Sequence, residues 1–421
     1  GIQGEGARLQ LDFNYSLGAV FNNGSDDSDD FEDSHFLNAV ASIEAIEDNL
    51  FIDVNANAGI SLIDSTDTIA PDINAGSNNT TQTYSLSVSP YARYHFGTFA
   101  DGTLRYNTDT FSTGTSGNDS DMTEWSLSLD SGRRFQVMTW GLSASYSDLS
   151  YDNDTNDEKT NVNSNFQYQL NRKFSLDFGL GYENYELDNE LNDYDDTEGM
   201  TWDVGTTWTP NPRTTLKVSY GDDILGGNWS MDFKYRHRKS TITSSYTTSI
   251  TNSRTERLDS IARNSSDING DPLFYGDEDL YLDPLLPSLS SENIVQDMFR
   301  LAYQFSSKKT TIGIDASYAE RDYQDPANPR STEDFNTSIS LSRKLSPVTS
   351  LTSRISWLQR EETTADSDEE VLTLRVGVNT SLGVNSNLSV DFQHSDSDSS
   401  GTVYDDDYEE NRVSATLGMT F

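Results

Sequence analysis

The chain has 421 residues, which is enough for two or three ordinary domains or for one large barrel. Its 28 Lys and Arg residues stand against 69 Asp and Glu residues, and the resulting net charge of -41 argues against nucleic acid as a partner. The chain contains no cysteine, which excludes a disulfide, a thiolate metal site and covalent haem attachment.

Hydropathy does not point to membrane helices. Hydrophobic residues make up 34% of the chain and the mean hydropathy is -0.65, values that are typical of a soluble acidic or partly disordered protein. The 21 Tyr, 19 Phe and 6 Trp argue against disorder. No stretch approaches the roughly 18–20 apolar residues of a membrane helix, but a barrel strand needs an apolar residue only at every second position.

Residues of alternating polarity run through most of the chain. In segment 50–62, Leu50, Ile52 and Val54 alternate with Asp53 and Asn55. Because successive side chains of a strand point to opposite faces, this pattern predicts strands with one apolar and one polar face. Helical periodicity is nearly absent. In chain order, the alternation recurs at 84–96, 138–146, 174–182, 229–236, 312–318, 372–378 and 413–421.

The connections between these segments are of two alternating kinds. Short turns are predicted at 47–49, 171–172, 210–212, 346–347 and 383–385. Long acidic loops are predicted at 23–33, 64–80, 113–121, 151–158, 188–198, 322–331, 362–369 and 395–410. Short periplasmic turns and long extracellular loops are typical of outer-membrane barrels.

The sequence therefore predicts an all-β fold, a transmembrane antiparallel outer-membrane β-barrel of about 20 strands (roughly 18–20), with 1–421 as one domain. Aromatic residues near predicted strand ends, such as Phe96, Phe99, Trp202 and Trp208, fit interfacial girdles. The alternative is a soluble β-sandwich, which would turn its apolar face inward, or a β-solenoid, which would show a fixed repeat.

The last strand carries a predicted assembly signal. Its apolar positions include Val413, Leu417, Met419 and Phe421, and bacterial outer-membrane barrels end on such a C-terminal aromatic, which their assembly machinery reads. We expect this strand to pair with the first one, near residues 8–22. We also expect Gly1 to begin a processed chain, because an outer-membrane protein is first exported.

Four short phrases resemble the outer-membrane β-barrel family associated with PEP-CTERM/exosortase systems. These phrases are Ser89–Tyr94, Gly132–Phe135, Gly181–Asn184 and Trp208–Thr214. The resemblance runs along most of the chain, but it does not cover the acidic loops or segment 251–294. It implies an outer-membrane barrel encoded near exopolysaccharide and protein-sorting genes, and it implies no established activity.

The polar face of the predicted strands would line a lumen of mixed charge. With about 20 strands, that lumen is too wide for side chains alone to fill. It would be a water-filled channel or a closed interior laced with ion pairs. The lumen-lining residues that we predict are Asp53, Arg93, Arg105, Asp177, Asp203, Lys217, Asp232, Lys234, Arg236, Arg300, Asp315, Arg354, Arg375 and Asp391.

Segment 251–294 is the candidate plug. It is predicted as a long extracellular loop, and such loops are usually functional or disordered. It contains an apolar cluster between Leu280 and Pro287. We expect the segment to fold into the lumen or to dock a partner; the alternative is a surface loop packed on itself.

One acidic segment has the spacing of a calcium loop. Asp396, Asp398 and Ser400 occupy positions 1, 3 and 5, Gly401 position 6 and Asp407 position 12. A single Ca²⁺ bound there is one interpretation. The other is a solvated acidic surface that divalent cations screen near lipopolysaccharide.

The sequence gives little support to an enzyme. Of the four histidines, His35 and His394 would lie near the outer strand ends, with Asp33 and Asp396 nearby, and no G-x-S-x-G motif occurs. Loop or interfacial hydrogen bonding is the simpler role for both, and a barrel hydrolase is the weakest hypothesis. No catalytic residue and no cofactor is predicted.

The hypothesis that we favour is a porin-like channel, integral to a bacterial outer membrane. The alternative is a non-conducting structural or partner-binding barrel of an exopolysaccharide, sorting or surface-assembly system, one form of which is a sheath around a periplasmic electron-transfer protein. Expected partners are outer-membrane lipid, lipopolysaccharide and the barrel assembly machinery, with a protein or polysaccharide partner in the alternative case.

Overall fold

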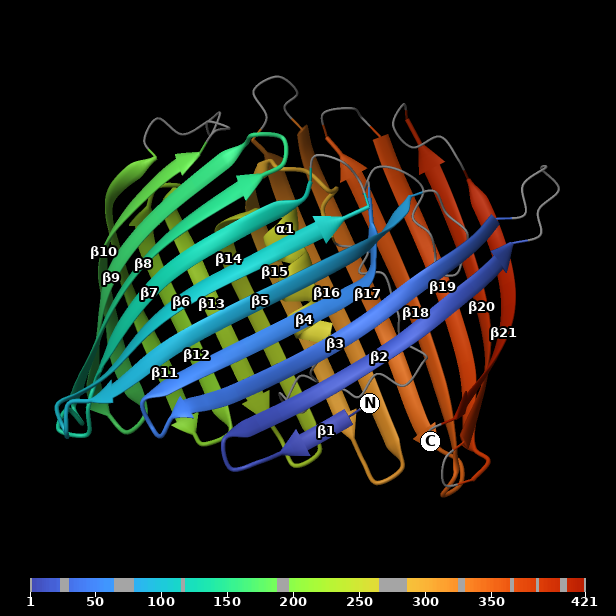
Figure 1. Ribbon diagram of the computed structural model, residues 1–421, viewed down its shortest axis with the longest axis horizontal. Coiled ribbons are helices and arrows are strands. Elements are labelled where there is room, and N and C mark those ends of the chain that lie inside the picture. The colour runs from blue at the N-terminus through green and yellow to red at the C-terminus, as the bar shows by residue number, and fades with distance from the viewer. Residues whose placement is uncertain are drawn as a thin grey trace.

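A computed structural model describes residues 2–22, 30–63, 79–114, 118–187, 197–264, 286–324, 330–363, 367–383, 386–401 and 407–419. Within these ranges the chain forms one antiparallel sheet of 21 strands and one helix (Figure 1). The first strand has four residues, and the other strands have ten or more.

Each strand pairs with the next one along the chain, from the first pair to the last. The predicted all-β fold and strand number are therefore confirmed. The elements are β1 (Ile2–Glu5), β2 (Leu9–Asn22), β3 (Asp30–Ile46), β4 (Leu50–Leu62), β5 (Thr80–His95), β6 (Ala100–Thr113), β7 (Ser120–Ser131), β8 (Met138–Tyr151), β9 (Asn156–Asn171), β10 (Phe174–Leu187), β11 (Glu198–Asn211), β12 (Thr214–Asp223), β13 (Gly226–Arg236), β14 (Ser240–Asn252), α1 (Ser253–Asn264), β15 (Asn293–Ser306), β16 (Thr310–Tyr323), β17 (Arg330–Lys344), β18 (Thr349–Glu362), β19 (Ser367–Ser381), β20 (Ser386–Ser400) and β21 (Tyr408–Met419).

Contacts between distant strands show that the sheet curls. Arg257 of α1, which follows β14, donates a hydrogen bond to Ser61 of β4 at 2.9 Å. In a flat sheet, β4 and β14 would be about 48 Å apart, since neighbouring strands are about 4.8 Å apart. Figure 1 shows the blue and cyan strands crossing in front of the green and orange ones, with α1 between them. The sheet therefore encloses an interior that contains the helix.

The first and last strands, β1 and β21, form the two edges of the sheet. Within the described ranges, β21 pairs with β20, and β2 pairs with β3 and with β1. The short β1 lies along the edge of β2 from Phe13 to Gln10. The pairing of β21 with β2 thus stays a prediction.

The predicted alternation of short turns and longer connections is borne out by the strand bounds. Residues 47–49, 172–173, 212–213 and 345–348 connect successive strands at one end of the sheet. Two predicted loops are shorter than expected. β8 and β9 leave a turn of residues 152–155, where Asp154 has a φ of 67°, because Asp and Asn tolerate the left-handed region of tight turns. β20 continues to Ser400, so 395–400 belongs to a strand.

The outer face of the sheet is apolar, as the alternation predicts. On β7, Trp125 and Leu127 are exposed, and Leu127 lies between Leu104 and Ala144 of the neighbouring strands. Exposed apolar side chains at every second position are unfavourable in water and are what a bilayer requires. Among the described residues, no helix is long and apolar enough to cross a membrane.

Aromatic side chains gather near both ends of the strands. Trp202, Tyr220 and Trp229 form one chain of rings with centroids 6.1 Å and 4.9 Å apart. At the turn end, the ring centroid of Phe174 lies 6.2 Å from that of Trp208. These clusters match the girdles that barrels place at the two membrane interfaces.

We expect Leu127→Lys to destabilise the barrel by about 2–4 kcal/mol, because it places a cation against lipid near the middle of β7. The adjacent Ser128→Lys, on the inner face, is the matched control and should change stability little. Urea-dependent unfolding in detergent, followed by heat-modifiable gel mobility, measures both. Equal losses for the two variants would contradict the assignment of faces.

Candidate functional site: the lumen and helix α1

The fourteen predicted lumen residues share the inward face of the sheet. Cross-strand register connects them: Asp203 lies opposite Gly179, Lys217 opposite Asp232, and Arg354 opposite Arg375. Ser61 shares the face of Asp53 on β4 and contacts α1, which fixes this face as the interior.

Part of the inner charge is paired. Arg105 Nη1 lies 3.2 Å from Asp53 Oδ2 and donates to Ser89 at 2.7 Å. Across the sheet, Arg375 Nε lies 3.7 Å from Asp391 Oδ1. Asp177 accepts hydrogen bonds from Gln167 and Thr207, both at 2.8 Å. The interior is therefore polar, of mixed charge and partly cross-linked.

Two arginines at the turn end stack on aromatic rings of the inner face. The Phe51 and Tyr91 rings stack with centroids 5.2 Å apart, and the Arg93 guanidinium lies 5.0 Å from each. The Arg105 guanidinium lies 4.0 Å from the Tyr91 centroid. Such cation–π contacts hold the guanidinium groups in place without neutralising them.

The described ends of segment 251–294, which was predicted as a long extracellular loop, contain regular secondary structure. Residues 251–252 belong to β14 and 293–294 to β15, and α1 begins directly after β14. The Asn252 side chain accepts a hydrogen bond from the backbone N–H of Thr255 at 2.8 Å, which is an N-cap. Glu256 lies in the first turn, where a negative charge stabilises the helix. The sequence signal for this helix is Asn252 followed by the acidic residue Glu256. The alternating polarity of the preceding strand made that signal hard to recognise.

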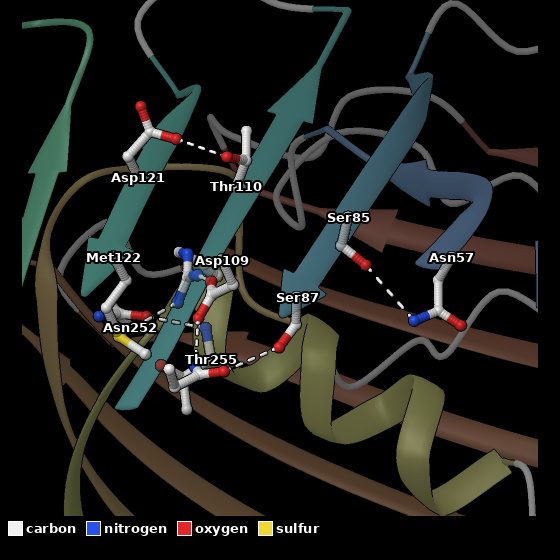
Figure 2. Close-up of polar contacts among 11 residues, drawn as sticks. Asn57, Ser85, Ser87, Asp109, Thr110, Asp121, Met122, Asn252 and Thr255 are labelled. Carbon is white, nitrogen blue, oxygen red and sulfur yellow. Dashed lines mark hydrogen bonds and ion pairs between the residues drawn. The ribbon is translucent and has the colours of Figure 1, made fainter. Parts of the chain in front are cut away.

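The start of α1 contacts the opposite wall. Arg254 forms a buried ion pair with Asp109 of β6, and its Nη1 lies 3.7 Å from Met122 Sδ of β7. Figure 2 shows Asp109 and Met122 beside Asn252 and Thr255, at the point where the helix begins. Strands β6 and β7 are thereby joined to the end of β14 through the interior.

Arg257 donates four hydrogen bonds at this contact. Its guanidinium donates to Ser61 Oγ at 2.9 Å, to the Leu62 carbonyl at 2.8 Å and to the Pro287 carbonyl at 3.0 Å. It also donates to the carbonyl of Ser253 in its own helix at 3.1 Å. The side chain is only 3% exposed. One residue therefore ties α1 to β4 and to the returning segment.

The returning segment 286–292 adds contacts to the wall and to α1. The Leu289 N–H donates to the Ile63 carbonyl at 2.7 Å, and Ser253 Oγ donates to the Ser290 carbonyl at 2.7 Å. Asn153, in the β8–β9 turn, donates to Ser291 at 2.8 Å. We call α1 and residues 286–292 the plug. The prediction that 251–294 enters the lumen agrees with this placement for the part of the segment that the structure describes.

Burial shifts the titration of the two plug arginines. It lowers the pKa of Arg254 to about 10 and that of Arg257 to about 9. Both guanidinium groups remain charged at neutral pH, so the contact between α1 and the wall holds two desolvated cations. Each needs its hydrogen bonds, because an unpaired buried charge is very costly.

Three neighbouring strands, β16, β17 and β18, share a buried ionic cluster that sequence reasoning did not assemble. Arg360 Nε donates to Asp334 Oδ1 at 2.6 Å, and Arg321 pairs with the other oxygen of Asp334. Arg321 Nε also donates to Gln296 at 2.7 Å. All of these residues face inward on β15–β18. Their positions on the polar face of the predicted strands were the sequence signal that could have identified them.

The calcium interpretation required a loop, and the structure shows a strand. Asp396, Asp398 and Ser400 follow one another along the outer face of β20, opposite Leu372, Glu370 and Asp368 of β19. Side chains at every second strand position lie about 6.6 Å apart and do not converge on one ion. Asp407 instead accepts hydrogen bonds from Ser399. In the described ranges no group of three or more His, Asp or Glu side chains could hold a metal.

The two candidate histidines face outward. The His35 ring nitrogen Nδ1 lies 2.8 Å from Tyr15 Oη, and His394 Nδ1 lies 3.0 Å from Asn411 Oδ1. These interfacial contacts fit the hydrogen-bonding role.

The residues of the predicted assembly signal lie in or near the last strand. Val413 and Leu417 are exposed on the outer face, Met419 ends β21 and Phe421 lies outside the described residues.

Comparisons with known proteins give the fold and no family. No family model and no curated protein matches the chain. Solved structures with the same architecture include the FrpB iron transporter from Neisseria meningitidis (11% identity, 93% of this chain and 73% of that chain, TM-score 0.53). The siderophore receptor PirA from Acinetobacter baumannii is also similar (9% identity, 97% and 73%, TM-score 0.52). So is a mutant of the ferric enterobactin receptor PfeA from Pseudomonas aeruginosa (10% identity, 99% and 81%, TM-score 0.50).

These similar structures are outer-membrane β-barrels, and the exposed apolar residues on the outer face of the present sheet suit a lipid environment. The chain has the fold of an integral outer-membrane β-barrel.

Arg257→Ala should release the plug from β4, because it leaves the Leu62 and Pro287 carbonyls without their donor, at about 1–3 kcal/mol each. Since the chain has no cysteine, a spin label on Asp259→Cys reports on the helix alone. We expect the label to become mobile on the nanosecond timescale in Arg257→Ala and to stay ordered in the control Arg8→Ala. An unchanged spectrum would show that Arg257 does not hold the plug.

Proposed function

We propose that this chain is a gated outer-membrane channel whose pathway is the polar lumen and whose closed state is held by the plug. The observation that carries the proposal is the pair of buried arginines, Arg254 and Arg257, which tie α1 to β6 and β4 across the interior. A plug held by a few polar contacts can be released without unfolding the barrel.

The acceptors of Arg257 favour a reversible contact. All four are neutral oxygens, three carbonyls and one hydroxyl. Hydrogen bonds to neutral groups are roughly half as strong as those to carboxylates. Water entering the lumen could replace them at modest cost, whereas the Arg321–Asp334–Arg360 cluster of the wall would persist.

The inner face supports passage of small polar or charged solutes. Inward-facing cations and anions occur together along it, such as Lys217 opposite Asp232. Barrels of this fold include an iron transporter and a siderophore receptor, so the architecture is compatible with transport. The solute class follows from the mixed charge: hydrophilic, with no strong preference for one sign.

The competing proposal is a barrel that never conducts and serves as a structural or partner-binding element of an exopolysaccharide or sorting system. Burial of the plug supports it as well. A barrel hydrolase has no such support, because His35 and His394 lie on the outer face.

Replacing residues 253–292 by an Asn-Gly turn should convert the closed barrel into an open pore. Asn252 and Asn293 are register partners at the ends of β14 and β15, so a two-residue turn joins them without shifting the strands. In planar bilayers the native chain should show small, rare openings and the deletion a steady conductance at least about tenfold larger.

Arg254→Ala with Arg257→Ala should give intermediate, flickering openings, and Arg8→Ala should behave as the native chain. A folded, heat-modifiable deletion variant that never conducts would overturn the channel and favour the partner-binding barrel.

In the plug-deleted background, Arg105→Gln should make the pore more selective for cations. The substitution removes one inward positive charge and leaves Asp53 without its 3.2 Å partner. The reversal potential in a potassium chloride gradient measures the change. The control is Arg8→Gln, at an exposed position in a turn. An equal shift of the reversal potential in both variants would show that the ion path does not run past Arg105.

A further inference from the structure

The turns at the periplasmic end carry an uneven charge. Six consecutive turns, from β7–β8 to β17–β18, hold twelve exposed Lys and Arg side chains. We call this set the basic rim: Arg133, Arg134, Arg172, Lys173, Arg213, Arg236, Arg238, Lys239, Lys308, Lys309, Arg343 and Lys344.

No acidic residue accompanies these cations locally. The six turn segments contain no Asp or Glu, although the chain as a whole has 69 of them. Within the described ranges none of the twelve takes part in an ion pair. The segments are 131–138, 170–174, 209–215, 235–241, 305–311 and 342–349.

The turns on the other side of the barrel have the opposite character. The β3–β4 turn region carries Glu44, Glu47 and Asp48, and its nearby cation, Arg8, is paired with Glu47 at 3.3 Å. In the β5–β6 turn, His95 Nδ1 lies 2.7 Å from Asp101 Oδ1. The periplasmic end is therefore divided into a long basic arc and a shorter acidic one.

We propose that the basic rim is the docking surface for a folded periplasmic protein with an acidic face. A one-sided arc fits a partner that must sit in one orientation, because complementary charge fixes register and speeds encounter. Anionic phospholipid surrounds a barrel evenly and gives no reason for the arc to stop at β7 and β18.

The direction of the side chains favours the same occupant. Arg236 and Lys344 share the inward face of Lys234 and Ser340, whereas Arg343 is on the outward one. Inward positions surround the mouth of the lumen and are out of reach of lipid outside the barrel. A protein that covers the mouth contacts both the inward-facing and the outward-facing cations. The proposal does not depend on whether the plug opens.

The first test measures binding of fluorescent poly-L-glutamate to the full barrel in phosphatidylcholine nanodiscs. K308Q/K309Q/R343Q/K344Q, which neutralises two adjacent turns, should weaken binding at least about tenfold, and added salt should weaken it further. The matched control E44Q/E47Q/D48N, at the acidic arc, should bind as well as the native chain or better. Equal binding by all three chains would overturn the proposal.

The second test finds the occupant in cells. A photo-crosslinking residue at Pro347, beside the basic rim, should capture one acidic protein, and the same residue at Asn49, in the acidic arc, should not. Neutralising Lys308, Lys309, Arg343 and Lys344 should abolish that adduct while heat-modifiable mobility stays native. Adducts to phospholipid alone, or a protein adduct that survives neutralisation, would overturn the proposal.

Discussion

The need to satisfy every backbone hydrogen bond inside a bilayer governs this structure. Lipid offers no partner to an N–H or a carbonyl group, so each strand must be paired along its length. The chain meets this with successive antiparallel strands that alternate an apolar and a polar residue. A sheet of that many strands curls around a space that its own side chains cannot fill. The interior must then be closed, or be used, by something else.

In this chain the element that enters the interior leaves from one strand of the sheet and returns to the next. The plug leaves from β14, crosses to β4, β6 and β7, and returns to β15. Most of its contacts to the wall are made by charged and polar side chains, with one backbone hydrogen bond from Leu289 to Ile63, whereas neighbouring strands are joined by whole ladders of backbone hydrogen bonds. In the proposed gating, release of the plug breaks the Arg254–Asp109 ion pair, the hydrogen bonds of Arg257 and the Leu289–Ile63 bond. The strand pairing of the wall stays intact.

The sequence predicts the sheet far better than the plug. A period of two persists over many strands and places residues such as Asp53 and Val413 on the correct faces. Helix α1 was not predicted from the sequence, because it is short, strongly polar and flanked by strands, so its periodicity spans only a few turns. The calcium spacing at Asp396 was misleading for a different reason. Residues at every second position also suit a strand, and the structure shows that this segment pairs with β19 as part of β20. The contacts of Arg257 with Leu62 and Pro287 join residues far apart in sequence, which no local pattern encodes.

The position of the plug also bears on how the chain can be altered. Asn252 and Asn293 face each other across neighbouring strands, so everything between them lies within one hairpin connection. A change of length in that connection leaves the register of β14 and β15 as it is, because the strand pairing ends at these two residues. The wall and the interior segment are therefore separable parts: the wall is specified by strand pairing and by lipid, and the interior segment by its own side-chain contacts.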